Sequence, residues 1–160
     1  MSAIAPEPPA TAPYRLRPAT NGDAAWLYAL HVACLREYVA QTWGWDEATQ
    51  RRMFAERFDP RASQIVLVDG RAVGVVAVER RADGYFIGNI AIDPAWQGRG
   101  VGAAIIRDIQ GAAAREGGLV RLRVLKVNPA RRLYERLGFV VVGETATHYL
   151  LAAGERAGQP

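Results

Sequence analysis

The sequence predicts one domain of mixed α/β class, with a central, mostly antiparallel sheet flanked by about four helices. Three observations predict it. The chain has 160 residues, half of them hydrophobic and 22% charged, which is typical of one globular domain. Its middle third holds three strand-like runs separated by short turns. A glycine-rich loop then opens an amphipathic helix that leads into a further strand.

The first half of the domain is mainly helical. Residues 14–17 predict a short strand, and Asn21 or Asp23 then caps a helix that runs to about Tyr38. We expect a break over residues 41–45 and a second helix over residues 46–58, which Pro60 ends.

The middle of the chain predicts a meander of three strands. Residues 64–68 and 71–80 flank Asp69-Gly70, a strong hairpin turn. A second turn over residues 82–84 leads into a strand over residues 85–92.

The last third alternates helices and strands. The expected elements are a helix at 101–115, a strand at 119–126, a short helix at 129–137 and strands at 139–143 and 147–152. Because a helix connects them, the strands at 85–92 and 119–126 should be parallel.

Composition bounds the function and the ends of the domain. Cys34 is the only cysteine and there are two histidines, so we expect no intrachain disulfide and no metal site. The net charge of +4 is spread along the chain, which permits an anionic ligand without indicating nucleic acid. We see no secretory signal and no membrane span, so we expect a cytoplasmic protein. We expect residues 1–13 to be a disordered leader, 14–152 the domain and 153–160 a loose tail.

The loop before the helix at 101–115 predicts a phosphate site. It has the sequence QGRGVG, whose glycines allow the backbone to approach a ligand closely. Free N–H groups in the first helical turn and the helix dipole attract anions, and Arg99 adds a positive charge. The candidate cofactor-binding residues of this loop are Gln97, Gly98, Arg99, Gly100, Val101, Gly102 and Ala103.

Other interpretations of the loop are a connector without a ligand and a dinucleotide-binding fingerprint. The pattern Gly98-x-Gly100-x-x-Ala103 fits the fingerprint, which needs an acidic residue near the end of the next strand. That strand ends in Leu125-Lys126, and no Gly-Lys-Ser/Thr triplet is present for a P-loop.

Two motifs resemble the GNAT superfamily of N-acetyltransferases. Gln97-x-x-Gly100-x-Gly102 is similar to the signature Q/R-x-x-G-x-G/A, which binds the pyrophosphate of acetyl-CoA in that family. The segment 128–139 ends in LYERLGF and is similar to the family's second motif, while residues 89–94 resemble its fourth strand. The resemblance covers about residues 14–151 and implies the family's fold, with strands four and five parallel and splayed.

The resemblance implies an acetyl-CoA-dependent transfer to a primary amine by direct attack in a ternary complex. Acetyl-CoA is the co-substrate, and its pantetheine inserts beside Ile90, Ala91 and Ile92. Tyr134 stands where the family commonly carries its general acid. Asn128 and Arg131 are cofactor contacts on the same basis.

Asn128 departs from the family pattern. It precedes Tyr134 by six positions, where much of the family has seven. Asn128 could therefore cap the short helix before Pro129.

The general base stays open between two residues and water. Ribosomal-protein N-terminal acetyltransferases of this superfamily carry a glutamate in the strand before the second motif, and the strand at 119–126 has none. Histone-type members place a glutamate in the fourth strand, where this chain has Phe86 or a neighbour. The remaining candidates are His148, which has the better intrinsic pKa, and Glu37.

The break between the first two helices predicts one wall of an acceptor cleft. Carboxylates and aromatic rings there could attract a cationic amine. The same residues could instead pack the helix pair and cap the second helix. The candidate substrate-binding residues are Glu37, Tyr38, Trp43, Trp45 and Asp46.

The acceptor is therefore expected to be a small-molecule or peptide primary amine, with no nucleic-acid or membrane partner and with a homodimer allowed. Two other functions stay open: an NAD(P)-binding, Rossmann-like reductase and a non-catalytic CoA-binding sensor on the same fold.

Overall fold

The computed structural model describes residues 13–155 and residue 157. Most of the predicted leader and part of the predicted tail lie outside these residues. Along the described chain the helices and strands follow the expected order, and short 3-10 turns precede α1, β2 and the glycine-rich loop. No helix in this part of the chain is long and apolar enough to cross a membrane.

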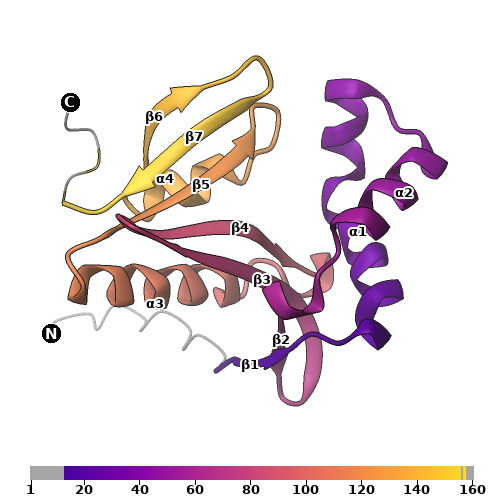
Figure 1. The fold of residues 1–160 in the computed structure, drawn as a ribbon, viewed down its shortest axis with the longest axis horizontal. Helices are drawn as coiled ribbons and strands as arrows, with labels where there is room; N and C mark the ends of the chain where they lie inside the picture. The colour runs from indigo at the N-terminus through magenta and orange to yellow at the C-terminus, as the bar shows by residue number, and fades with distance from the viewer. Residues whose placement is uncertain (1–12, 156, 158–160) are drawn as a thin grey trace, which may run out of the picture.

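In the part of the chain that the structure describes, seven strands form one mixed sheet (Figure 1). Their order is β1-β2-β3-β4-β5-β7-β6, and β4 and β5 are parallel while the other neighbours are antiparallel. This confirms the predicted fold class and the parallel pair. The strands are β1 (Arg15–Pro18), β2 (Gln64–Val68), β3 (Arg71–Arg81), β4 (Gly84–Ile92), β5 (Leu119–Leu125), β6 (Val140–Glu144) and β7 (His148–Ala153).

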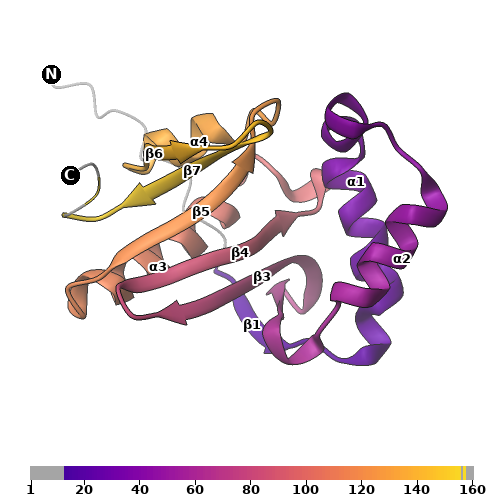
Figure 2. The same ribbon diagram turned by 45° about the horizontal axis from the view of Figure 1, so that its top comes forward.

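Within residues 13–155, four α-helices flank the sheet. In Figures 1 and 2, α3 runs along β4 and β5, α4 lies beside β5 and β7, and α1 and α2 stand beside the C-terminal end of β4. The helices are α1 (Ala24–Trp43), α2 (Glu47–Arg57), α3 (Val101–Arg115) and α4 (Arg131–Arg136).

The core lies on both faces of the sheet. Ile105 and Ile106 of α3 are fully buried beneath the central strands, as the amphipathic pattern of that helix predicts. On the other face, Leu27 and Leu30 of α1 pack with Val75 of β3. The two helical layers thereby hold β4 between them.

Helix α1 is longer than the sequence predicts. It continues to Trp43, whereas a break was expected from residue 41. Val39 is buried and Thr42 Oγ1 donates a hydrogen bond to the Tyr38 carbonyl, so the last turn is stabilised. The helix ends at Gly44, whose φ of 80° only glycine adopts at low cost.

Strands β4 and β5 pair over only part of their length. Their register runs from Gly84 opposite Leu119 to Ile87 opposite Leu122 and stops there. Gly88 has no partner on β3 either, because Val78 pairs with Ile87 and Ala77 with Asn89. Such a β-bulge bends a strand and redirects its side chains. We call residues 88–92 the open segment of β4, and both views show β5 separating from it (Figures 1 and 2).

The start of β4 provides a test of how tightly this strand is held. Gly84 has a φ of 141°, and a Cβ there would overlap the backbone of Leu119. We expect Gly84→Ala to lower the free energy of unfolding by about 3 kcal/mol or more in a denaturant titration. Gly70→Ala is the matched control, because Gly70 has a φ of 76° and a Cβ added there would meet nothing within 4 Å. Gly70→Ala should lower the free energy of unfolding by about 1 kcal/mol. Equal costs would contradict the close contact between the two strands.

Candidate active site

The open segment of β4 presents backbone groups to the side from which β5 has separated. The Asp93 N–H donates to the Val73 carbonyl at 2.7 Å, so alternate residues before it, Ala91 and Asn89, also face β3. The backbone groups of Ile90 and Ile92 therefore point the other way.

Contacts at Ile92 support this direction. Its carbonyl accepts hydrogen bonds from Gln97 Nε2 at 2.9 Å and from Cys34 Sγ at 3.2 Å. These bonds tie the end of β4 to the glycine-rich loop and to α1. Of the three residues predicted to pair with pantetheine, Ile90 and Ile92 point backbone groups to the open side, whereas those of Ala91 face β3.

The glycine-rich loop ends in a helix N-terminus. Gly98 and Gly100 have φ values of 76° and 81°, and Gly100 caps α3. The first helical N–H to find a carbonyl within this turn is that of Ala104, which donates to Gly100 at 3.0 Å. The earlier N–H groups have no acceptor inside the helix, so they can bind an anion. They belong to Val101, Gly102 and Ala103.

Arg99 lies beside this N-terminus. Its guanidinium stacks over the Trp96 ring, 4.6 Å from the centroid. The stacking holds a positive charge in the loop, which favours phosphate.

Tyr134 lies on α4, inside the core that joins α3, α4 and β5. It is 8% exposed, and its ring meets that of Phe139 edge-on with centroids 6.0 Å apart. Burial raises the pKa of Tyr134 above its ordinary value of 10.0. The phenol therefore stays protonated near neutral pH and can act as a hydrogen-bond donor or acid.

Asn128 and Arg131 take part in local contacts around α4. Asn128 Oδ1 accepts a hydrogen bond from the Ala130 N–H at 2.9 Å, and this bond turns the chain into the helix. Arg131 Nε donates to Glu135 at 2.6 Å, and its guanidinium stacks 4.2 Å above the Tyr149 ring. The bond to Asn128 lies in the turn before α4, whose N-cap is Ala130 and which no side chain caps, so the expected capping of the helix by Asn128 is wrong.

His148 lies where β5 ends. It pairs with Leu125 in the register of β5 and β7, and its ring centroid is 6.0 Å from that of Trp43 on α1. Its Nδ1 is 2.8 Å from Thr147 Oγ1. Burial, and then the positive charge of Arg123, lower the pKa of His148 below its ordinary value of 6.5. A neutral imidazole at pH 7 can accept a proton.

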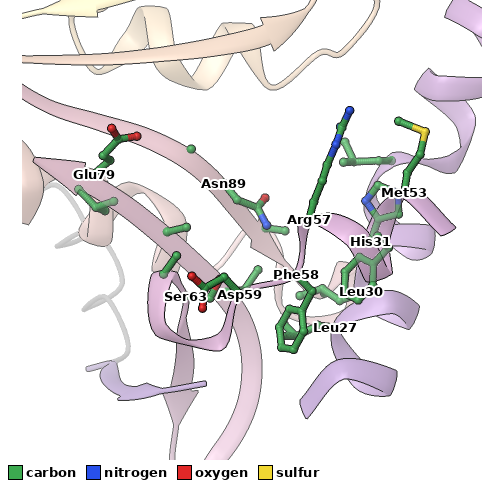
Figure 3. Close-up of a pocket in the computed structure, with 18 of the residues that line it drawn as sticks. Leu27, Leu30, His31, Met53, Arg57, Phe58, Asp59, Ser63, Glu79 and Asn89 are labelled. Atoms are coloured by element: carbon green, nitrogen blue, oxygen red, sulfur yellow. The ribbon is translucent and has the colours of Figure 1, made fainter. Parts of the chain in front are cut away.

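A cavity of about 660 Å³ lies between the helices α1 and α2 and the strands β3 and β4 (Figure 3). Both sides contribute side chains, and the cavity reaches the open segment of β4. The helical side supplies Leu27, Leu30, His31, Leu35, Gln50, Met53, Phe54, Arg57 and Phe58. The strands supply Val75, Ala77, Val78, Glu79, Gly88, Asn89 and Ala91, and the turn before β2 supplies Asp59, Ala62 and Ser63.

The five residues predicted for acceptor binding lie outside the lining of this cavity. Trp43 is 60% exposed beside His148, and Glu37 and Tyr38 lie on the same helix. Trp45 and Asp46 have contacts within the helix pair. Trp45 Nε1 donates to Glu47 at 2.9 Å, and Asp46 caps α2 by accepting from the Thr49 N–H at 2.7 Å.

Asn89, Glu79 and Arg57 line the cavity, and none of the three was predicted from the sequence. A glycine inside a strand pattern, here Gly88, is a signal for a bulge and could have drawn attention to Asn89. No local sequence pattern marks Arg57 and Glu79 as site residues, because only the packing of α2 beside the strands brings them to one cavity. Within the described residues, no three His, Cys, Asp or Glu side chains gather as metal ligands.

The chain is similar to a known type of domain. The family model described as "Acetyltransferase (GNAT) domain" matches residues 60–141, about half of the chain. A curated relative, N-alpha-acetyltransferase RimI of Mycobacterium tuberculosis, is 36% identical over 72 residues. That match spans 44% of this chain and 44% of the relative.

Solved structures share the fold. The PaiA N-acetyltransferase of Thermoplasma acidophilum, in complex with coenzyme A, aligns with a TM-score of 0.71 at 13% identity, covering 88% of this chain and 98% of that one. The ribosomal-protein-S18-alanine N-acetyltransferase of Escherichia coli aligns with a TM-score of 0.61 at 21% identity, covering 89% and 97%.

The pKa of His148 can be measured directly. We expect its ring to titrate below 6.5 in an NMR pH series, with signals assigned by their loss in His148→Gln. Arg123→Gln should raise the pKa part of the way, because burial remains. The unfolded chain takes up this proton at higher pH than the folded chain, so the contribution of His148 to stability falls as the pH drops below 6.5. A pKa above 6.5 in the folded protein would contradict this account.

Proposed function

Because the chain belongs to the acetyltransferase (GNAT) domain family, we propose that it transfers an acetyl group from acetyl-CoA to a primary amine. The observation that carries the proposal is the continuity between the open segment of β4 and the N-terminus of α3. An extended amide chain can pair with the first, and a pyrophosphate can bind the second. The RimI relative and the coenzyme A complex support this proposal by their names.

The residues present fit acetyl-CoA. The N–H groups of the first turn of α3, with Arg99 beside them, suit the pyrophosphate. The backbone groups of Ile90 and the N–H of Ile92 suit the amides of pantetheine. Gln97 keeps the loop at the end of β4 through its bond to the Ile92 carbonyl, so both parts of the site keep a fixed separation.

The proposed chemistry is direct attack in a ternary complex. The neutral amine attacks the thioester carbonyl, a carbon–nitrogen bond forms and the carbon–sulfur bond breaks. A backbone N–H of the open segment donates to the oxygen that becomes negative, which is the strongest kind of stabilisation for such a step. Tyr134 donates a proton to the leaving thiolate, and the proton lost by the amine passes to His148, Glu37 or water.

Family membership removes the support for an NAD(P)-dependent reductase. A non-catalytic CoA-binding sensor on the same fold would bind acetyl-CoA but would not transfer the acetyl group. Release of free thiol from acetyl-CoA in the presence of amines is therefore the experiment that tests the proposed function. The cytoplasmic location and the homodimer stay predictions of the sequence.

Introducing a negative charge at position 102 tests the proposed pyrophosphate site. A Cβ there would meet Ile92 Cγ1 at 3.7 Å, an ordinary contact, so side chains are tolerated. Gly102→Asp should weaken CoA binding at least tenfold in calorimetry, because its charge opposes that of the pyrophosphate. Gly102→Asn is the control of the same size without the charge, and it should bind CoA markedly more tightly than Gly102→Asp does. A negative charge near a helix N-terminus stabilises the helix, so we expect Gly102→Asp to fold. Unchanged CoA affinity in Gly102→Asp would argue against this site.

Tyr134 is tested by removing its hydroxyl. Tyr134→Phe should lower kcat by about 10- to 100-fold while the Kd for acetyl-CoA stays near its original value, since general acids contribute at least this much. Tyr85→Phe is the control, because the Tyr85 hydroxyl contacts Glu116 at the opposite end of β4. Stopped-flow or steady-state thiol release gives kcat. If kcat does not change at saturating substrates, Tyr134 is not the acid.

A further inference from the structure

The cavity beside β4 has one apolar wall. The side that α1 and α2 supply is built largely from aliphatic and aromatic side chains, and the rings of Phe54 and Phe58 stack there. Burying an apolar group against such a wall is favourable in proportion to its area. The volume of about 660 Å³ is in the range of small-molecule sites. This wall therefore suits an apolar group.

The cavity borders the same strand as the proposed thioester site. Asn89 and Ala91 line it and both belong to the open segment of β4. Ile90 lies between them and turns its backbone groups to the edge where pantetheine would pair. An occupant of the cavity would therefore lie beside the strand along which pantetheine would pair, close to the bulge around Gly88.

The charged groups of the cavity are few and of both signs. Figure 3 shows Glu79 and Arg57 rising from opposite walls, with Asp59 near the floor. Asp59 is engaged by Arg61, through its N–H at 2.9 Å and its Nε at 3.3 Å.

The contact between Glu79 and Arg81 is 3.4 Å long and exposed, so it is weak. Glu79 can therefore attract one ammonium group, while Arg57 disfavours a second positive charge.

We propose that the acceptor is a primary amine with a single positive charge and an apolar body. The inference rests on the proposed function and adds the substrate class. The amine nitrogen reaches the thioester beside Asn89, the apolar body packs against the wall of α1 and α2, and Glu79 attracts the ammonium form before it loses its proton. Polyamines and short polar amines are poor acceptors in this arrangement.

The test compares three aliphatic amines and one peptide with a free N-terminus by thiol release at saturating acetyl-CoA. Hexylamine should exceed propylamine in kcat/KM by roughly 50-fold, because each added methylene contributes about fourfold when it is buried. Hexylamine should also exceed 1,6-diaminohexane, which has the same length and a second charge, by at least tenfold. A higher kcat/KM for the diamine, or for a peptide N-terminus, would overturn the assignment.

Variants of the cavity assign the effect to its walls. Ala77→Phe should fill the cavity and lower kcat/KM for hexylamine at least tenfold, with the Kd for acetyl-CoA unchanged. Val142→Phe is its control, since Val142 lies on β6 and is 48% exposed.

Two further variants separate the charges. Glu79→Gln should raise the KM for hexylamine, because the charge that attracts the ammonium group is lost. Arg57→Gln should lower the ratio of kcat/KM for hexylamine to kcat/KM for the diamine, because the charge that repels the second ammonium group is lost. Arg52→Gln, an exposed change on α2 outside the cavity, should do neither. If Ala77→Phe leaves hexylamine unaffected, the acceptor binds elsewhere.

Binding of CoA separates failure of this inference from failure of the proposed function. Calorimetry on the whole chain measures acetyl-CoA first and then hexylamine in the presence of CoA. If CoA binds but hexylamine neither binds nor reacts, the acceptor class is wrong while the CoA site stands. If CoA itself does not bind, the proposed function fails, and the acceptor assignment fails with it.

Discussion

The end of pairing between β4 and β5 after Ile87 and Leu122 is the constraint on which the candidate site depends. A sheet strand with an unpaired side exposes N–H and C=O groups that need partners. The bulge at Gly88 changes which backbone groups of β4 point to that side, so Ile90 and Ile92 face it. An extended ligand that carries amides satisfies this edge as a further strand would.

The rest of the molecule holds that edge in position. Helix α3 packs its buried isoleucines beneath the central strands, and its N-terminus lies just beyond the end of β4. Gln97 and Cys34 both bind the Ile92 carbonyl, which fastens the glycine-rich loop and α1 to the same point. On the opposite face, a cavity lies between the helix pair α1 and α2 and the strands β3 and β4. A donor along the edge and an acceptor in the cavity would therefore meet at β4.

Local signals explain why most of the fold could be predicted from the sequence. The Asp69-Gly70 turn, the glycine-rich loop and the apolar stripe of α3 each depend on neighbouring residues, and all appear as expected. The predicted end of α1 was wrong. The pattern Trp-Gly-Trp suggested an early break, whereas Val39 and Thr42 stabilise another turn of the helix. The cavity between the helix pair and the strands could not be predicted, since only the packing of α2 beside the strands brings Arg57 and Glu79 into its lining. Asp46 illustrates the same limit, because one carboxylate can serve as a cap or as a ligand and the sequence allows both.

Residue-level hydrogen exchange on the whole chain, with and without CoA, tests the central claim most directly. The account predicts that the amide N–H groups of Ile90 and Ile92 exchange more slowly when CoA is bound, because they gain a hydrogen-bond partner. The N–H groups of Asn89 and Ala91 face β3 and serve as internal references whose exchange changes little. The account is contradicted if CoA saturates the protein and the exchange of Ile90 and Ile92 stays the same.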